Sequence, residues 1–253
     1  MLNYNRRPEM RNHSVVQIRT ILLAWLVSAI LAVARSTRDD DILWTQLSHG
    51  GDFPLVGFGV GNLQHELISD RIAKSLAEDK KTILIDTAHA SKNEEKVRDG
   101  IAKGVKGRKL SEVHVVTKVW YTHLGYERTK ISVKESLEAL KGKNIKVHVL
   151  IHWPRCNDEI PWMNCIEEEK DLPPEVKKAG RPPHEYKDTA FLDSWAALED
   201  IFLGRVQLGK GLPKIESIGV SNFGLEDFKA LEKTMRVTPH ILQVRQIFSI
   251  FAL

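Results

Sequence analysis

This sequence of 253 residues has only short apolar runs, little net charge and few cysteines. Its longest apolar run, residues 21–34, is shorter than the roughly 20 residues that a transmembrane helix needs. Its net charge is only +4, and residues 1–34 hold most of the excess, with four arginines against one glutamate. The rest of the chain therefore lacks the basic surface typical of nucleic-acid-binding proteins, and we expect no nucleic-acid partner. Cysteine is rarer still, with two in the chain.

The apolar run near the N-terminus has the form of a targeting segment. It follows a basic start and ends in small residues, with Ala32 and Ala34 forming an A-x-A site. This order predicts a signal peptide over residues 1–34, cleaved after Ala34, and a location in the secretory pathway or outside the cell. The alternative is a signal anchor, in which residues 21–34 hold the protein at a membrane. Residues 35–43 follow as a charged linker.

The two cysteines, Cys156 and Cys165, stand on either side of the short segment NDEIPWMN. In an oxidising compartment they would form a disulfide that closes this loop and stabilises the fold by a few kcal/mol. Two unpaired thiols in a loop explain the sequence equally well, so both interpretations stay open.

From residue 44 onward, short β-type runs alternate with amphipathic helical patterns. The runs are rich in β-branched residues and nearly continuous in apolar character, which favours strands buried on both faces of a parallel sheet. Between them, apolar residues recur every three or four positions, as in helices that cover a sheet. The predicted strands are 55–59, 82–88, 113–120, 147–153, 215–222 and 240–247, and the predicted helices are 69–79, 93–105, 129–140, 191–203 and 225–235. This alternation predicts βαβ units.

Such units build either an open doubly wound sheet or a closed (β/α) barrel. The first strand–helix turn, GFGVGNLQHE, lacks the G-x-G-x-x-G fingerprint of a dinucleotide-binding doubly wound sheet. Polar residues also collect at the C-terminal ends of the predicted strands, where parallel barrels place their chemistry. They are Asp86, Lys118, His152 and the pair Ser221-Asn222. We therefore expect an α/β fold of the (β/α)8 TIM-barrel type.

Asp86, Lys118 and His152 together suit proton transfer to a carbonyl group. A buried lysine is costly unless it is paired, and an aspartate on a neighbouring strand would offset that cost. The paired ammonium group can lower the pKa of a nearby hydroxyl, while a neutral histidine can donate a hydrogen bond to a carbonyl oxygen. Each residue alone has a structural explanation, as a helix cap, a rim lysine or a core histidine. All three at one edge of the sheet favour a catalytic site.

Longer stretches of the sequence resemble the aldo-keto reductases, NAD(P)H-dependent (β/α)8 barrels that reduce aldehydes and ketones. The stretches occur in the family's order from about Trp44 to Leu253. They are LSHGGDFPLVGFGVGN, ILIDTAHASKNEEKV, VVTKVW, SLEAL, VLIHWP, LDSWAALE, IGVSNFG and TPHILQV. The resemblance implies a partial reductase barrel domain over residues 44–253. It would begin with a β-hairpin and contain about six of the family's eight strands, which describes a C-terminally truncated member.

The resemblance implies roles for individual residues as well. The family uses an Asp, a Tyr, a Lys and a His, and the Tyr supplies the proton. Asp86, Lys118 and His152 match three of these four positions, and Ser91 stands at the position of the Tyr. His89, two residues earlier, is expected in the wall of the site.

Other matches concern the cofactor and the substrate. Ser221, Asn222 and Gln243 match the residues that hold the nicotinamide carboxamide, with Asp86 beside the cofactor. Aromatic positions that line the family's substrate pocket are matched by Trp120 and Trp153. NADPH is the expected cofactor and NADH the second choice, and no metal ligands are predicted.

Ser91 is the first departure from the family's pattern, and the two missing strands are a larger one. A serine hydroxyl is far less acidic than a phenol, whose pKa is about 10, and its side chain is shorter. Proton donation would pass to His152, to water or to another tyrosine such as Tyr121. Ser91 also begins an S-x-x-E sequence that ends at Glu94, the form of a helix capping box. A lost catalytic group and a helix cap are compatible interpretations.

The sequence thus predicts an oxidoreductase that transfers hydride from NAD(P)H to a small aldehyde or ketone. The alternative is a catalytically inactive family member, or a truncated product, that keeps the scaffold for binding a ligand or partner. Ser91 and the two missing strands are the features that favour the alternative.

Overall fold

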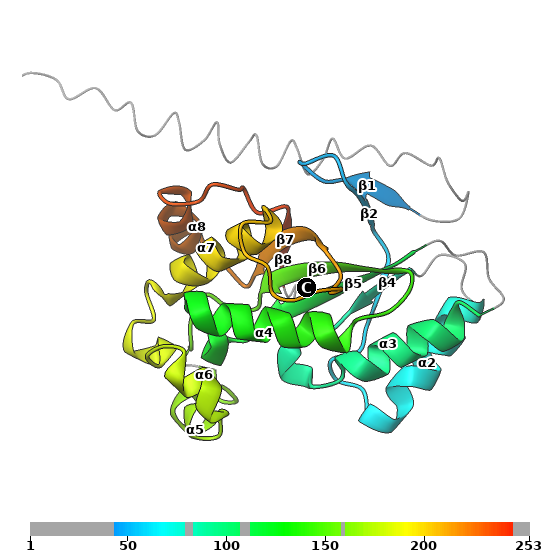
Figure 1. Cartoon of the computed structure of the whole chain (residues 1–253), viewed down its shortest axis with the longest axis horizontal. Helices are drawn as coiled ribbons and strands as arrows, with labels where there is room; N and C mark the ends of the chain where they lie inside the picture. Colours follow the sequence, from blue (N-terminus) through cyan, green and yellow to red (C-terminus); the bar gives the residue numbers. More distant parts are fainter. Residues whose placement is uncertain (1–42, 79–82, 107–111, 158–159, 245–253) are drawn as a thin grey trace, which may run out of the picture. The chain divides into compact units, whose positions relative to one another are not determined.

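Six parallel strands form the main sheet in a computed structural model that describes residues 43–78, 83–106, 112–157 and 160–244 (Figure 1). The strands are β3 (Gly57–Gly59), β4 (Leu84–Asp86), β5 (Val113–Val119), β6 (Ile145–Ile151), β7 (Ile215–Ser221) and β8 (Ile241–Gln243). Each strand pairs with the next one along the chain, without the reversal of order that defines a doubly wound sheet. The predicted α/β fold of the TIM-barrel type, with six strands, is confirmed.

Helices follow the strands in the order that the sequence predicts. The long ones are α2 (His65–Glu78), α3 (Glu94–Gly104), α4 (Tyr126–Ala139), α7 (Ala190–Phe202) and α8 (Leu225–Glu232). Short turns complete the connections, namely η1 (His89–Ser91), η2 (Tyr121–His123), α5 (Cys165–Lys170), α6 (Pro174–Lys178) and η3 (Pro183–Glu185). In Figure 1, α3 and α4 run alongside the sheet.

α4 begins three residues earlier than predicted, because Gly125 takes a positive φ of 101° that turns the chain into the helix. The Tyr126 hydroxyl then donates to Asp200 Oδ2 of α7 at 2.9 Å and so fixes the first turn. The apolar periodicity of one segment cannot indicate a hydrogen bond to another helix, so the early start of α4 was not predicted.

An antiparallel hairpin, β1 (Trp44–Gln46) and β2 (Asp52–Pro54), precedes the sheet, as predicted. Phe53 of this hairpin packs on a buried apolar cluster made by Leu84, Val116 and Leu150. These three residues belong to three neighbouring strands, so the cluster is a layer of side chains on one face of the sheet. Side chains of a strand alternate between faces, and the residues two positions further along therefore share this face.

Those residues are Asp86, Lys118 and His152, at or just beyond the C-terminal ends of β4, β5 and β6. The apolar layer thus forms a floor beneath them. The fold brings the three predicted catalytic side chains to one place by strand register alone.

The apolar runs predicted that every strand is buried on both faces. This prediction is wrong at the two edges of the sheet. Leu55 and Val56 precede β3 rather than belonging to it, and both are exposed. Leu242 of β8 is also exposed. β3 and β8 each have a single neighbouring strand among the described residues, and side chains at such edges lack a second strand to cover them.

All described residues belong to one of two compact units of the chain, residues 36–253. The predicted signal peptide or anchor, residues 1–34, lies outside the described residues. Within the described part of the chain, no helix is both long enough and apolar enough to span a bilayer.

Candidate functional site

A cavity of about 810 Å³ opens at the C-terminal ends of the parallel strands. Nine residues that the sequence singled out for catalysis, cofactor binding or the substrate pocket all line it. They are Asp86, Ser91, Lys118, Trp120, His152, Trp153, Ser221, Asn222 and Gln243. Their joint position follows from parallel pairing, which brings the ends of all the strands to the same edge.

Lys118 is the buried charge at the centre of this wall. Its ammonium nitrogen Nζ donates to Asp86 Oδ1 at 2.6 Å and to the Thr87 carbonyl oxygen at 2.7 Å. Burial lowers the pKa of Lys118, while the charge of Asp86 and the hydrogen bond to it act in the opposite direction. Two of its three N–H groups thus donate hydrogen bonds to described residues. The third is left for a group in the cavity.

His152 follows β6 and lies beside this pair. Its backbone N–H donates to the Val119 carbonyl at 3.0 Å, and its ring meets the Trp120 ring edge-on at 4.9 Å. Burial, and then the charge of Lys118, lower the pKa of His152 to about 3, so the ring is neutral at pH 7. Its Nδ1 is buried without a hydrogen-bond partner among the described residues, which leaves Nε2 to bind a cavity ligand.

Ser221, Asn222 and Gln243 meet where β7 and β8 end. Ser221 is paired with Gln243, and the Asn222 backbone N–H donates to the Gln243 carbonyl at 3.1 Å. The Asn222 side chain donates to the His152 carbonyl at 2.9 Å and to Ser221 Oγ at 3.1 Å. Asn222 adopts the left-handed conformation, with φ 59°, which asparagine tolerates better than most residues. These bonds hold a hydroxyl and two amides at the cavity wall.

Ser91 ends the turn η1 and faces the cavity, but it does not cap a helix. The N-cap of α3 is Asn93, so the predicted capping box is wrong. Lys92, with a left-handed φ of 47°, separates Ser91 from the helix start. Glu94 instead accepts a hydrogen bond from Thr117 Oγ1 at 2.5 Å. Helix capping therefore does not explain why a serine is present at position 91.

Two other predictions around the site are also wrong. His89 is not part of the cavity wall, because its Nε2 lies 2.7 Å from Glu135 Oε2 of α4. Tyr121, considered as a substitute proton donor, is buried and absent from the cavity wall. Its hydroxyl donates to Glu168, and burial together with this carboxylate raises its pKa above the usual value. Tyr121 thus lies in the core, and its hydroxyl binds Glu168 of α5.

Trp162, which was not predicted as a site residue from the sequence, lines the cavity from the loop after β6. Cys156 and Cys165 form a disulfide, the first of the two interpretations above, and close the loop that carries this tryptophan. The Trp162 ring stacks near Trp120 at 6.1 Å and meets Trp153 at 5.9 Å. A tryptophan between two cysteines was the one available signal. Together the three rings give the cavity an aromatic side.

The sequence is similar to curated reductases over 79% of its length. It is 27% identical over 201 residues to the NADH-dependent D-xylose reductase of Candida parapsilosis and 30% identical over 204 residues to the glyoxal reductase of Bacillus subtilis (strain 168). The chain spans 57% of the length of the first protein and 56% of the second.

The fold is similar to solved structures of the same kind. An aldo/keto reductase from Brucella melitensis matches with a TM-score of 0.58 at 24% identity, over 81% of this chain and 63% of that one. An aldo-keto reductase of Bombyx mori in complex with NADP matches with a TM-score of 0.56 at 24% identity, over 80% of this chain and 58% of that one. A sequence model described as "Aldo/keto reductase family" matches residues 74–250. Because this match covers well over half of the sequence, the chain belongs to the aldo/keto reductase family.

Proposed function

We propose that the protein is an NAD(P)H-dependent oxidoreductase that reduces a small aldehyde or ketone. The observation that carries this proposal is the ion pair of buried Lys118 with half-buried Asp86, beside a neutral His152 on one cavity wall. This arrangement offers hydrogen-bond donors to an oxygen that gains negative charge, as a carbonyl oxygen does during reduction. Similarity to a xylose reductase and a glyoxal reductase supports the same chemistry.

The residues present fit the nicotinamide end of the cofactor. Ser221, Asn222 and Gln243 offer both donors and acceptors at the cavity wall, which is what a carboxamide requires. The Asn222 NH2 group is engaged by His152 and Ser221, so its Oδ1 is the atom left to accept from a ligand amide. When bound, the cofactor supplies the hydride. We take NADPH as the first choice and NADH as the second.

The chain's own residues orient the carbonyl group. His152 Nε2–H donates to the carbonyl oxygen, and the remaining N–H of Lys118 adds positive charge on the same side. Trp120, Trp153 and Trp162 form the aromatic wall against which the apolar part of the substrate packs.

Proton delivery is the step that Ser91 changes. A serine side chain leaves room where a phenol ring would stand, and we place a water molecule there. Lys118 donates a proton to this water, which passes its own proton to the alkoxide oxygen of the product, and solvent then recharges the lysine. Water is a weaker acid than a positioned phenol, so the reaction should be slow.

Steady-state oxidation of NADPH with glyoxal, methylglyoxal and xylose tests this proposal. We expect slow turnover by the wild-type chain and a rise of about 10²-fold or more in kcat for Ser91→Tyr, since general acid catalysis contributes factors of this size. The matched control is Ser91→Phe, which fills the same space without a hydroxyl and should give no rise. Absence of turnover with NADPH and NADH in both the wild type and Ser91→Tyr would refute the proposal.

A second candidate is a non-catalytic member that binds the nucleotide without reducing a substrate, and Ser91 is the observation that favours it. NADPH fluorescence separates the two functions. Tight binding without turnover in Ser91→Tyr supports the second candidate, whereas turnover in that variant refutes it.

We also propose that this domain works in an oxidising compartment, either secreted or anchored by residues 21–34. Support comes from the Cys156–Cys165 disulfide, because such bonds persist mainly outside the cytosol. Cell fractionation with a C-terminal tag, followed by mass measurement of the mature chain, tests it. A species that begins after Ala34 indicates cleavage, whereas a cytosolic chain with free thiols contradicts the proposal.

A further inference from the structure

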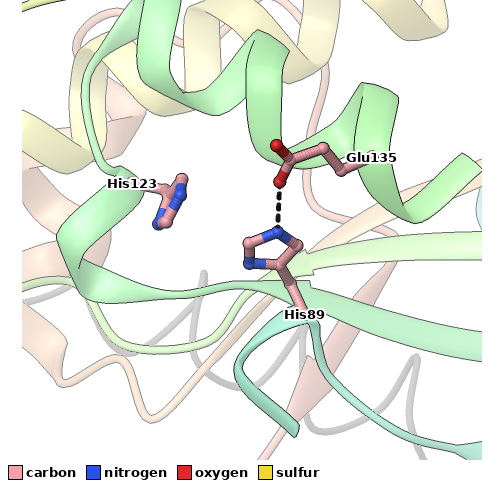
Figure 2. Close-up of side chains that lie close together, drawn as sticks. All are labelled: His89, His123 and Glu135. Atoms are coloured by element: carbon pink, nitrogen blue, oxygen red, sulfur yellow. Dashed lines mark hydrogen bonds and ion pairs between the residues drawn. The ribbon is translucent and has the colours of Figure 1, made fainter. Parts of the chain in front are cut away.

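A second cluster of functional side chains lies outside the cavity, where η1, η2 and α4 meet. His89 of η1 and Glu135 of α4 approach with 2.7 Å between Nε2 and Oε2. The rings of His89 and His123 lie 4.8 Å apart between centroids, inclined by 68°. Figure 2 shows the three side chains converging from three separate segments. One donor atom from each residue lies within 4.8 Å of the other two.

From this geometry we propose that His89, His123 and Glu135 form a binding site for a divalent transition metal, with Zn²⁺ as the preferred ion. Two imidazoles and one carboxylate are a set that zinc accepts, with water in the fourth position. Zinc–ligand bonds of about 2.0–2.2 Å place tetrahedral donors about 3.3 Å apart. The spacing of this cluster brackets that value, so binding requires adjustments of about 1 Å or a little more.

The flexible member of the cluster is on the outside. The Glu135 side chain is 44% exposed, whereas that of His89 is 16% exposed. His123 is buried at the end of η2. Metal entry therefore needs this exposed carboxylate to move off its 2.7 Å contact with His89 Nε2, and the two rings are the less exposed ligands.

A neighbouring hydroxyl prepares His123 for ligation. Thr122 Oγ1 lies 3.0 Å from His123 Nδ1, so it can accept a hydrogen bond from the N–H of that nitrogen, and Nε2 then keeps its lone pair. A hydrogen bond of this kind to the second ring nitrogen commonly orients a metal-binding histidine.

Three nearby positive charges would oppose a cation; two of them are paired, and the third, Lys92, is at an exposed position. Arg128 is held in a two-pronged contact by Glu169, at 2.8 Å for both bonds, and Lys134 is close to Glu138. Glu135 adds the negative charge that the site needs.

The site would also stabilise the cavity. The turn η1 contributes Ala90 and Ser91 to the cavity wall and His89 to the proposed site. A metal bound to His89 would therefore restrict the same three-residue turn that positions Ser91.

Zinc titration of the full chain tests the proposal, with the protein stripped by a chelator and its disulfide intact. We expect one Zn²⁺ per chain by calorimetry, and Co²⁺ in its place should give the visible absorption of a four-coordinate centre. Glu135→Gln and His89→Gln should each weaken zinc binding at least 10-fold. Matched controls are Glu127→Gln on the same helix and His65→Gln on α2, both at exposed positions, which should bind as the wild type does.

Thermal unfolding in chelator shows whether each variant is folded, and Zn²⁺ should raise the melting temperature of the wild type more than that of Glu135→Gln. Equal zinc affinity in the wild type, Glu135→Gln and His89→Gln overturns the proposal, as does the absence of binding to the wild type. Binding that is lost in His49→Gln instead assigns the ion to the histidines near the hairpin and also overturns it.

Discussion

Asp86 controls the charge of Lys118, because it is the counterion that offsets the burial of the ammonium group. Removing the carboxylate charge leaves burial unopposed, and the pKa of Lys118 falls further. In Asp86→Asn, the lysine therefore loses its proton at a lower pH than in the wild type.

We expect the alkaline limb of the pH–kcat/KM profile to move downward by about one unit or more in Asp86→Asn, given the usual effect of a paired charge. The profile is best recorded in the Ser91→Tyr background, where turnover is faster. Asp70→Asn, an exposed aspartate on α2, serves as the control and should leave the profile unchanged. An alkaline limb at the same pH in Asp86→Asn would show that the pair does not set the lysine's charge.

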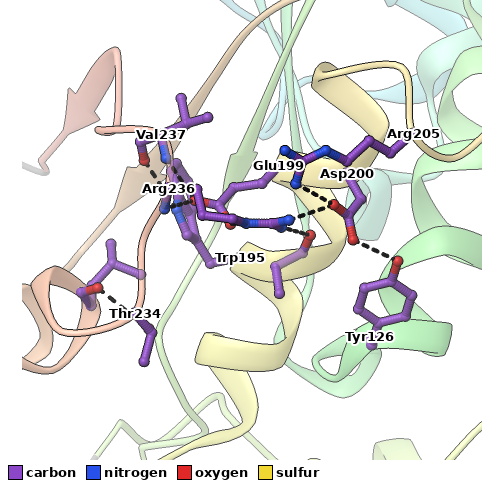
Figure 3. A network of polar contacts seen from close by, with 10 residues as sticks. Tyr126, Trp195, Glu199, Asp200, Arg205, Thr234, Arg236 and Val237 are labelled. Carbon is purple, nitrogen blue, oxygen red and sulfur yellow. Dashed lines mark hydrogen bonds and ion pairs between the residues drawn. The ribbon is translucent and has the colours of Figure 1, made fainter.

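At the scale of elements, a network of polar contacts ties α7 to the turn that leads into β8 (Figure 3). Glu199 is buried, and its carboxylate accepts from Arg236 Nε at 2.8 Å and from the Val237 backbone N–H at 2.7 Å. The turn precedes Gln243, so the network also positions part of the cavity wall.

Glu199→Ala should lower the free energy of unfolding by about 3 kcal/mol, because it leaves Arg236 without its buried partner and strands the backbone N–H groups of Arg236 and Val237. Asp200→Asn, which removes a more exposed contact of the same arginine, should lower it by less than about 1 kcal/mol. Urea unfolding of the two variants measures both values. Equal losses in the two variants would mean that burial of Glu199 does not matter.

At the scale of the whole molecule, buried neutral histidines make the fold sensitive to acid. His114 and His148 contact each other at 2.9 Å beneath the apolar layer, and burial is the first cause that lowers the pKa of each. The charge of Glu112 and its hydrogen bond with His114 act to raise the pKa of His114, against the effect of burial. His152, with its pKa lowered to about 3, lies above that layer.

The unfolded chain takes up protons on these rings near pH 6.5, and the folded chain does so only at lower pH. The stability that they provide is therefore complete above pH 6.5 and is lost as pH falls, by about 1.4 kcal/mol per pH unit for each histidine. Urea unfolding at pH 7.5, 6.5 and 5.5 should show little change over the first step and a clear loss over the second. Equal stability at pH 7.5 and 5.5 would contradict this prediction.

The sequence predicted the strands and the cavity well because both follow from nearly continuous apolar runs within short segments. Asp86, Lys118 and His152 each end an apolar run, and parallel pairing then fixes their common position. Contacts between distant segments were not predictable in this way. The direction of His89 depends on a three-residue turn and on Glu135, 46 residues away, and the position of Trp162 depends on closure of the disulfide loop.

We claim that a carbonyl carbon accepts hydride from the cofactor in this cavity, and deuterium labelling follows that transfer. NADPH deuterated at the transferable position is incubated with glyoxal and the full chain, and the alcohol product is examined by mass spectrometry. We predict product that carries one deuterium from the wild type, more of it from Ser91→Tyr, and a loss of at least 10²-fold in Lys118→Met, since that change removes the positive charge of the site. Absence of labelled product from both the wild type and Ser91→Tyr would contradict the claim.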